Sequence, residues 1–301
     1  MNAPALAETK PLPAAGRGRD YVTLGKPGIG IMVSVTAASG AILASGGPIF
    51  SWTMFHAALG TGLLSAGAAA LNHYFERDVD ARMARTAKRP LPSGRVPASH
   101  ALWFGVVLGC LGAVHLATFT TPAAAALGVI SLLLYVGVYT PLKTVTTWNT
   151  VVGAFPGAIP ILIGWSATGA RFDAAALALF AWLFLWQFPH FFAIAWIYRD
   201  DYAAAGIRMF PSTPVGRRYA ALQATSIAAL TVAVSLSPPL VALGGTTYAI
   251  LAAACGAYFL AYAIAFLREQ TPTRARMLMF SSLIYLPSVL GFLVLSAVAK
   301  S

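Results

Sequence analysis

The chain has 301 residues, of which 58% are hydrophobic and only 10% are charged, and its mean hydropathy is +0.73. Soluble domains carry about 25% charged residues, so this composition excludes an ordinary soluble domain. Apolar runs of about 20 residues, the length that crosses a bilayer, recur along the chain. They are long, rich in Leu and Ala and do not alternate, which argues against a barrel of strands. We therefore predict an all-α polytopic membrane protein.

Nine transmembrane helices are predicted from the apolar runs and the breakers between them. They lie near residues 28–46, 51–74, 101–118, 122–140, 150–168, 174–198, 219–238, 245–266 and 277–298. The connections alternate between short, nearly uncharged loops and longer, basic ones. Every Lys and Arg except Arg171 and Lys300 falls on the side of the basic loops. The positive-inside rule then places the N-terminus in the cytoplasm and, after nine spans, the C-terminus outside.

The N-terminal segment differs from the rest of the chain. Residues 1–25 are polar, contain Pro11 and Pro13, and lack the apolar segment of a secretory signal. We predict a disordered cytoplasmic arm over residues 1–25 and a nine-helix domain over 26–301. The net charge of +11 follows mainly from topology, with attraction to anionic lipid or an anionic substrate, so nucleic acid is not expected as a partner.

Topology does not explain the acidic residues, which gather at the ends of two spans. In "LNHYFERDVD", Asn72, Glu76 and Asp80 are four apart and drift only about 40° per step, so a helix that runs this far aligns them on one face. Asp78 points elsewhere. Three oxygen ligands in a row suit Mg²⁺, which completes its shell with water and phosphate oxygens. The alternative is a solvated helix end, and His73, beside the stripe, is expected to hydrogen-bond locally.

Basic residues follow the acids in "RTAKRPLPSG", where Pro90 and Pro92 are expected to end the helix. The guanidinium groups of Arg85 and Arg89 suit bidentate phosphate binding, although a solvated basic loop would look similar. Lys143 is the only charge in "YTPLKTVTTWN". It either closes over a diphosphate or serves topology, and the sequence does not decide between them.

The second acidic group lies in "WQFPHFFAIAWIYRDDYAAAG". His190 and Asp201 are eleven residues apart, so on one continuous helix they share a face within about 20°, whereas Asp200 is turned away by about 80°. His190 then lies about 16 Å along the helix from Asp201, which places it near mid-membrane. It either satisfies a carbonyl freed by Pro189 or is functional, since ionisable groups at that depth mark functional sites.

These segments together resemble a known family. The Asn72-xxx-Glu76-xxx-Asp80 pattern resembles the first acidic motif, N/D-xxx-D-xxx-D, of the UbiA-type intramembrane prenyltransferases. The stretches "RDVDARMARTAKRPLPSG", "YTPLK…WNTVVGAFPGAIPILIGW" and "WQFPHFFAIAWIYRDDYAAAG" resemble its protohaem IX farnesyltransferase (haem O synthase) branch. The resemblance covers essentially all nine spans and leaves out only the first ~20 residues.

The resemblance implies nine helices around a lipid-open cavity in the bacterial cytoplasmic membrane, with an active site toward the cytoplasm. It implies Mg²⁺-dependent transfer of farnesyl from farnesyl diphosphate to a vinyl of haem b, with hydration, giving haem O and diphosphate. A haem A synthase or a terminal oxidase assembly would take the product. The residues carried over are Asn72, Glu76 and Asp80 for the metal, Arg85, Arg89 and Lys143 for the diphosphate, and His190 and Asp201 as further catalytic groups.

One departure from the wider family concerns its second motif, which is normally D-xxx-D. Tyr198 and Tyr202 stand at those positions here, with Asp200 and Asp201 between them. We therefore expect one motif to hold metal while the other orients substrate, and rank Asp78, Asp200, Tyr198 and Tyr202 second. Whether His190 ligates haem iron or handles a proton stays open.

Three alternatives remain. A prenyltransferase could act on an aromatic quinone precursor instead of haem. A secondary transporter would place its charges near the midplane, whereas five acids here lie at one interface. A non-catalytic haem-binding assembly factor would leave the acidic stripe unexplained.

Overall fold

The computed structural model describes residues 18–300, and most of them are helical. The elements are α1 Gly18–Leu24, α2 Pro27–Ser45, α3 Trp52–Asp80, α4 Ala98–Phe119, α5 Pro122–Leu133, the π-helix η1 Leu134–Tyr139, α6 Thr140–Leu142, α7 Asn149–Ala167, α8 Ala174–Ile197, α9 Arg199–Ala204, the 3-10 helix η2 Phe210–Ser212, α10 Pro214–Ser235, α11 Pro238–Arg268 and α12 Pro272–Val298.

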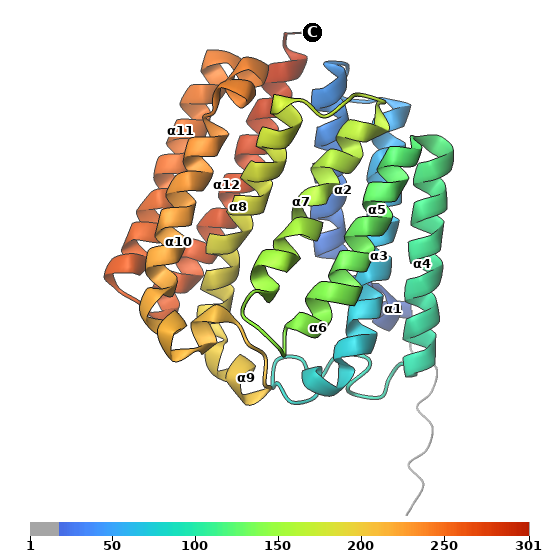
Figure 1. Ribbon diagram of the computed structural model, residues 1–301, viewed down its shortest axis with the longest axis vertical. Coiled ribbons are helices and arrows are strands. Elements are labelled where there is room, and N and C mark those ends of the chain that lie inside the picture. Colours follow the sequence, from blue (N-terminus) through green and yellow to red (C-terminus); the bar gives the residue numbers. More distant parts are fainter. Residues whose placement is uncertain (1–17, 301) are drawn as a thin grey trace, which may run out of the picture.

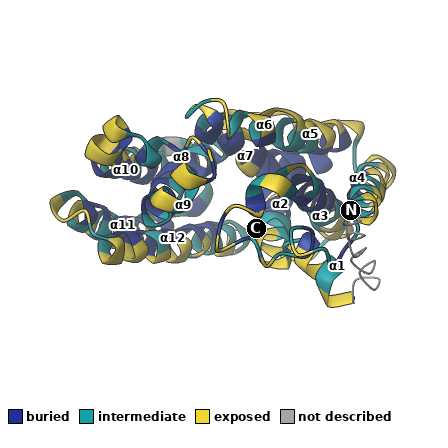
Figure 2. Cartoon of the chain, turned by 90° about the horizontal axis from the view of Figure 1, so that it is seen from below, coloured by how far each residue is buried: buried dark blue, intermediate teal, exposed yellow. Residues whose placement is uncertain are grey.

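The long helices lie side by side in one bundle (Figure 1). The short helices α1, α6 and α9 gather at one end of it, and the C-terminus lies at the other. Helix α7 packs against α2, α5 and α8, and α12 packs against α8 and α11. Of the helices that could cross a membrane, α7 is the most enclosed, with 78% of its apolar window buried, and it lies inside the bundle (Figure 2). The first and second halves of the chain therefore meet at α7.

Each of the nine predicted spans overlaps one of these helices. Within residues 18–300, eight helices are long and apolar enough to cross a membrane. The protein is therefore a multi-pass membrane protein, as the composition indicates. Helix α10, the seventh predicted span, carries Arg217, Arg218 and Gln223 and falls outside this set. The count of nine spans, and with it the positions of the two termini, stays a prediction.

The predicted disorder of the N-terminal arm is wrong for residues 18–24, which form α1. Three contacts hold this helix: Leu24 is fully buried, Tyr21 packs edge-on against Phe104, and Asp20 accepts a 3.0 Å hydrogen bond from Arg95. The polar composition hid these contacts because Phe104 and Arg95 lie more than 70 residues away from their partners in α1. Residues 1–17 of the arm lie outside the described part of the chain.

Helices α2 and α7 approach each other closely through glycine. A Cβ atom at Gly164 of α7 would overlap the carbonyl oxygen of Ala37, and one at Gly40 of α2 would overlap that of Ile161. Small residues permit such backbone contact between membrane helices. This contact fixes the position of Lys26, which directly precedes α2, relative to the rest of the bundle.

Candidate active site

Helix α3 carries the acidic stripe at its last two turns. It continues to Asp80, so Asn72, Glu76 and Asp80 lie on one helix at the predicted spacing. Asn72 and Asp80 are each 1% exposed, and the Glu76 side chain is 13% exposed. Asp78 is exposed and lies 3.6 Å from Arg77. The stripe therefore faces the protein interior while Asp78 faces away from it, which excludes a solvated helix end.

Each oxygen side chain of the stripe meets a cation from a different segment. Lys26 donates a 2.9 Å hydrogen bond to Asn72 Oδ1. Lys143 Nζ lies 2.6 Å from Glu76 Oε1, and Arg89 Nη1 lies 2.7 Å from Asp80 Oδ2. These six residues form what we call the ion-paired cluster. Two of its contacts, Lys143–Glu76 and Arg89–Asp80, are ion pairs, and the third joins Lys26 to the neutral amide of Asn72.

The π-helix η1 presents the next residues to the cluster. Its i+5 geometry is visible at Thr140, whose backbone N–H donates to the carbonyl of Tyr135. The Thr140 hydroxyl donates a 2.9 Å hydrogen bond to the same carbonyl. The same hydroxyl accepts a 3.2 Å hydrogen bond from Asn72 Nδ2. Lys143 Nζ lies 4.5 Å from the centre of the Tyr139 ring. Short π-helical segments occur frequently at functional sites, and this one turns Tyr139 and Thr140 toward α3.

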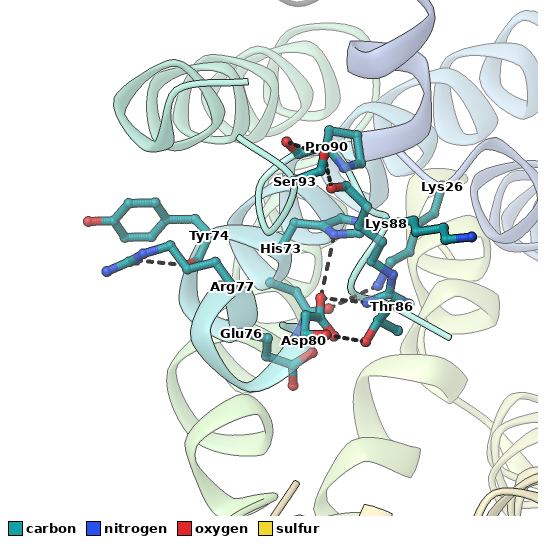
Figure 3. A network of polar contacts seen from close by, with 12 residues as sticks. Lys26, His73, Tyr74, Glu76, Arg77, Asp80, Thr86, Lys88, Pro90 and Ser93 are labelled. Atoms are coloured by element: carbon teal, nitrogen blue, oxygen red, sulfur yellow. Dashed lines mark hydrogen bonds and ion pairs between the residues drawn. The ribbon is translucent and has the colours of Figure 1, made fainter. Parts of the chain in front are cut away.

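The segment after α3 folds back onto it. Helix α3 ends at Asp80 rather than at Pro90, because the Thr86 hydroxyl donates a 2.7 Å hydrogen bond to the Asp80 carbonyl and a series of turns follows. Figure 3 shows Thr86 and His73 converging on Asp80. This reversal brings Arg89 to the Asp80 carboxylate, nine residues back along the chain.

Two loops are joined beside Lys143. The backbone N–H of Arg208 donates to the carbonyl of Lys143 at 2.7 Å, and its guanidinium donates to that of Val145 at 2.9 Å. Asn149, fully buried at the start of α7, donates a 2.8 Å hydrogen bond to the Arg208 carbonyl. The loop that carries Lys143 is therefore fixed to the segment after α9, and Asn149 and Arg208 position that lysine.

The second acidic group does not form one continuous helix. Helix α8 ends at Ile197, Tyr198 has non-helical angles (φ −108°, ψ 20°), and α9 starts at Arg199. The predicted common face of His190 and Asp201 is therefore wrong, because it assumed an unbroken helix. Asp200 is exposed beside Arg217, and Asp201 makes no ion pair within residues 18–300.

The two tyrosines of this group contact Arg85 instead. The Arg85 guanidinium lies 4.8 Å from the centre of the Tyr198 ring and 6.0 Å from that of Tyr202. Its Nη2 lies 3.5 Å from the Tyr202 hydroxyl. The segment from α8 to α9 thus supplies two aromatic rings to Arg85, in the basic segment that follows the acidic stripe. That this segment orients substrate stays a prediction.

Burial and neighbouring charges shift the pKa values of three groups in this region. Desolvation lowers the pKa of Lys26, and the nearby cations Lys143 and Arg89 lower it further. Burial also works against the charge of Lys143, but Tyr139 and Glu76 outweigh it and raise its pKa above 10.5. Burial raises the pKa of Tyr202 above 10.0, so this phenol stays protonated.

The donor set fits a hard divalent cation. Asn72, Glu76 and Asp80 offer the oxygen ligands that Mg²⁺ prefers. Glu76 Oε1 is buried and, despite its ion pair with Lys143, makes no hydrogen bond of acceptable geometry. Within residues 18–300, no three His, Cys, Asp or Glu side chains converge on one point, so a metal here would draw on the amide of Asn72 and displace the paired cations.

His73 is unsatisfied in the same place. It is 2% exposed, and neither ring nitrogen has a hydrogen-bond partner in the described chain. Its Nδ1 lies 3.9 Å from Asp80 Oδ2, too far for a hydrogen bond. The expected local hydrogen bond is therefore absent from the described residues, and His73 adds a polar group without a partner at the edge of the cluster.

His190 lies away from the cluster, inside α8. Its Nδ1 is 2.8 Å from the hydroxyl of Ser282 on α12, and its ring stacks on Trp186 at 5.3 Å. Its distance from the C-terminal end of α8, seven residues, corresponds to about 10 Å. The structure therefore joins Asn72, Glu76, Asp80, Arg89 and Lys143 in one cluster, with Arg85 held by the two tyrosines, and leaves His190 in a second environment.

Comparison with known proteins identifies the family. Residues 32–284 match the model of the UbiA prenyltransferase family. The chain belongs to this family. "Protoheme IX farnesyltransferase" of Solibacter usitatus is 41% identical over 288 residues, which covers 92% of this chain and 98% of that protein. The protein of the same name from Opitutus terrae is 42% identical over 282 residues, covering 92% and 94%.

Solved structures agree on the fold of this UbiA-family protein. A structure of digeranylgeranylglyceryl phosphate synthase superposes with a TM-score of 0.76 at 20% identity, covering 93% of this chain and 98% of that one. A UbiA homologue from Archaeoglobus fulgidus bound to DMAPP and Mg²⁺ gives a TM-score of 0.70 at 15% identity, covering 94% of this chain and 100% of that one.

The sequence analysis missed three residues of the site, which are Lys26, Thr140 and Asn149. Lys26 was counted only as a topology cation, and the two polar residues lie next to apolar runs without a charge to mark them.

Proposed function

We propose that this UbiA-family prenyltransferase transfers the farnesyl group of farnesyl diphosphate to a vinyl group of haem b, with addition of water, giving haem O and diphosphate. The ion-paired cluster supports the binding of the donor's diphosphate. In this cluster Asn72, Glu76 and Asp80 each contact a lysine or arginine from another segment. The acceptor and the chain length of the donor rest on the relatives named "Protoheme IX farnesyltransferase". Those relatives favour haem over an aromatic quinone precursor and over transport.

The cluster suits the arrival of a metal and a diphosphate together. Asn72, Glu76 and Asp80 would hold Mg²⁺, whose charge stabilises the departing diphosphate. Lys26, Lys143 and Arg89 then exchange their present oxygen partners for diphosphate oxygens, and Arg85 adds a bidentate contact. Because Glu76 and Asp80 are already paired with Lys143 and Arg89, neither buried carboxylate is left without a partner when the substrate is absent.

The rest of the reaction takes place in the bilayer. The farnesyl chain lies in a lipid-open cavity, which excludes water from the allylic cation that forms when the carbon–oxygen bond breaks. The terminal carbon of the haem vinyl attacks this cation, and water captures the new cation beside the porphyrin ring, releasing a proton. Asp201 and His190 are candidates for orienting substrate in this step, Asp201 from α9 and His190 from α8.

The same proposal sets the location of the site. The ion-paired cluster lies at the end of the bundle that carries the basic loops, which the positive-inside rule assigns to the cytoplasm of a bacterial inner membrane. Farnesyl diphosphate and haem b would enter there. A haem A synthase or a terminal oxidase assembly would receive the product.

Haem extracted from bacteria tests the acceptor. In a strain without its own farnesylated haem, expression of the chain should yield a haem heavier than haem b by one farnesyl group and one hydroxyl group, measured by mass spectrometry. Expression of the Glu76→Gln variant at equal membrane abundance is the control and should leave only haem b. Unmodified haem together with a prenylated quinone precursor would overturn the haem assignment.

A further inference from the structure

Ser282 contacts the His190 environment in two ways. Its hydroxyl oxygen lies 2.8 Å from His190 Nδ1, and its carbonyl accepts a 2.8 Å hydrogen bond from the indole N–H of Trp186. Trp186 in turn stacks on the His190 ring with an interplanar angle of 16°. Ser282 is fully buried on α12. One residue of α12 therefore fixes both rings of α8.

The hydroxyl proton of Ser282 determines which nitrogen of His190 is protonated. Ser282 Oγ donates a 2.6 Å hydrogen bond to the carbonyl oxygen of Met279, an atom that can only accept. Because a hydroxyl has a single proton, Oγ offers only lone pairs to His190. From this assignment of the hydroxyl proton we infer that Nδ1 is the donor in the 2.8 Å contact. In the neutral ring this leaves the lone pair on Nε2.

The other ring nitrogen, Nε2, makes no hydrogen bond within residues 18–300, and residue 190 is only partly buried. A histidine that donates one N–H to a fixed acceptor and keeps the other nitrogen free has the arrangement typical of a metal-ligating histidine. This arrangement fixes both the tautomer and the ring orientation.

The surroundings favour a neutral role for this ring. Helix α8 and the long helices packed against it, α7, α10, α11 and α12, contain no Asp or Glu. A histidine that acted as a base would become a cation without a counter-ion at this depth, which is costly. Coordination of iron instead leaves the imidazole uncharged and releases no proton.

We propose that His190 Nε2 binds the iron of the haem substrate and that Ser282 is a positioning residue which holds His190 in the required tautomer. This inference rests on the proposed function, because that function supplies the haem. The bond formed is a single coordination bond from the Nε2 lone pair to iron. It holds the porphyrin against α8 without a change in oxidation state.

The test measures binding of haem b to the purified full-length protein in detergent, without farnesyl diphosphate or Mg²⁺. Resonance Raman spectroscopy reports the iron–histidine stretch, and metal-free protoporphyrin IX reports packing of the porphyrin without iron. His190→Ala should lose the iron–histidine band, and added imidazole should restore it. Ser282→Ala should weaken haem b binding by about 10- to 100-fold and leave protoporphyrin IX binding unchanged.

Matched controls separate positioning from general damage. Ser281 is also buried and donates to a carbonyl three residues back, that of Leu278, so Ser281→Ala should bind haem b as the wild type does. Ser282→Thr keeps the hydroxyl and should retain the wild-type band. If Ser282→Ala does not fold, Ser282→Thr and His190→Ala decide.

Several outcomes would overturn the inference. A wild-type iron–histidine band in His190→Ala would place the iron elsewhere, and equal haem affinity of Ser282→Ala and Ser281→Ala would remove the positioning role. Wild-type protein that farnesylates haem b but shows no histidine band would exclude ligation while leaving the proposed function intact. Protein that neither binds nor farnesylates haem b would contradict the proposed function, and the inference with it.

Discussion

Asp80 has more neighbouring groups in the site than any other residue of the acidic stripe. Its carboxylate pairs with Arg89, its carbonyl accepts the Thr86 hydroxyl that turns the chain, and the unsatisfied ring of His73 lies beside it. Asp78, two residues earlier, is exposed and contacts only Arg77 among these groups. Sequence spacing already separated these two acids, since Asp80 continues the i, i+4 pattern from Asn72 and Asp78 does not.

This contrast gives a direct test of the stripe. Asp80→Asn keeps the shape of the side chain but removes the charge that meets metal and Arg89, so we expect haem farnesylation to fall about 10²- to 10³-fold. Asp78→Asn is the matched control and should retain activity within about twofold, as exposed substitutions do. Initial rates at saturating Mg²⁺ measure both. Equal loss in the two variants would contradict the assignment of Asp80.

Lys143 gives a prediction for pH. Its pKa is raised in the folded protein, so its contribution to stability is fully present below the unfolded value of 10.5 and is lost only as the pH rises through the higher folded value. Lys143→Met leaves Glu76 buried without a partner, which costs about 3–5 kcal/mol. The drop in melting temperature should therefore be the same from about pH 6 to about pH 9. A drop that shrinks across this range would show that Lys143 titrates there.

At the scale of elements, the helices were predictable and the breaks in them were not. Apolar runs located all nine long helices, because a span must be continuous to satisfy its own backbone in lipid. The end of α3 at Asp80 and the break at Tyr198 were missed for different reasons. Asp80 is followed by turns that a side-chain hydrogen bond from Thr86, six residues on, closes, whereas the sequence points to Pro90 as the helix stop. Tyr198 lies under Arg85, from 113 residues earlier in the chain, a contact that local sequence does not reveal.

The α2–α7 contact predicts an effect on stability. Gly164→Ala would force α7 away from the carbonyl of Ala37, and overpacking of this kind costs about 1–3 kcal/mol. Gly291 of α12 has open space around it, so Gly291→Ala should be neutral or stabilising by up to about 1 kcal/mol. Thermal unfolding in detergent compares the two. An unchanged melting temperature in Gly164→Ala would show that the helices do not touch as described.

At the scale of the whole molecule, the fold class could be predicted from composition. The arrangement of the site could not, because it depends on contacts between distant parts of the chain. The charge asymmetry of the loops and the motif at the end of α3 could be read directly from the sequence. The placement of Lys26 beside Asn72 could not, because it depends on the close packing of α2 with α7. The same limit applies to His190, whose partner Ser282 lies 92 residues away on α12.

Topology is the prediction at this scale. If α10 crosses the membrane together with the eight more apolar helices, the C-terminus lies outside the cytoplasm. A C-terminal alkaline phosphatase fusion should then be active in intact bacteria, and a C-terminal green fluorescent protein fusion should stay dark. A bright fluorescent fusion would mean that α10 does not span, and that the count is eight.

The central claim is that the ion-paired cluster holds metal and diphosphate for farnesyl transfer to haem. The measurement that tests it most directly is the mass of the haem recovered from purified protein supplied with haem b, farnesyl diphosphate and Mg²⁺. We predict a product heavier by one farnesyl group and one hydroxyl group, absent when a chelator is added and restored by excess Mg²⁺. The same product at the same rate in the presence of chelator, or in a variant lacking Asn72, Glu76 and Asp80 oxygens, would contradict the account.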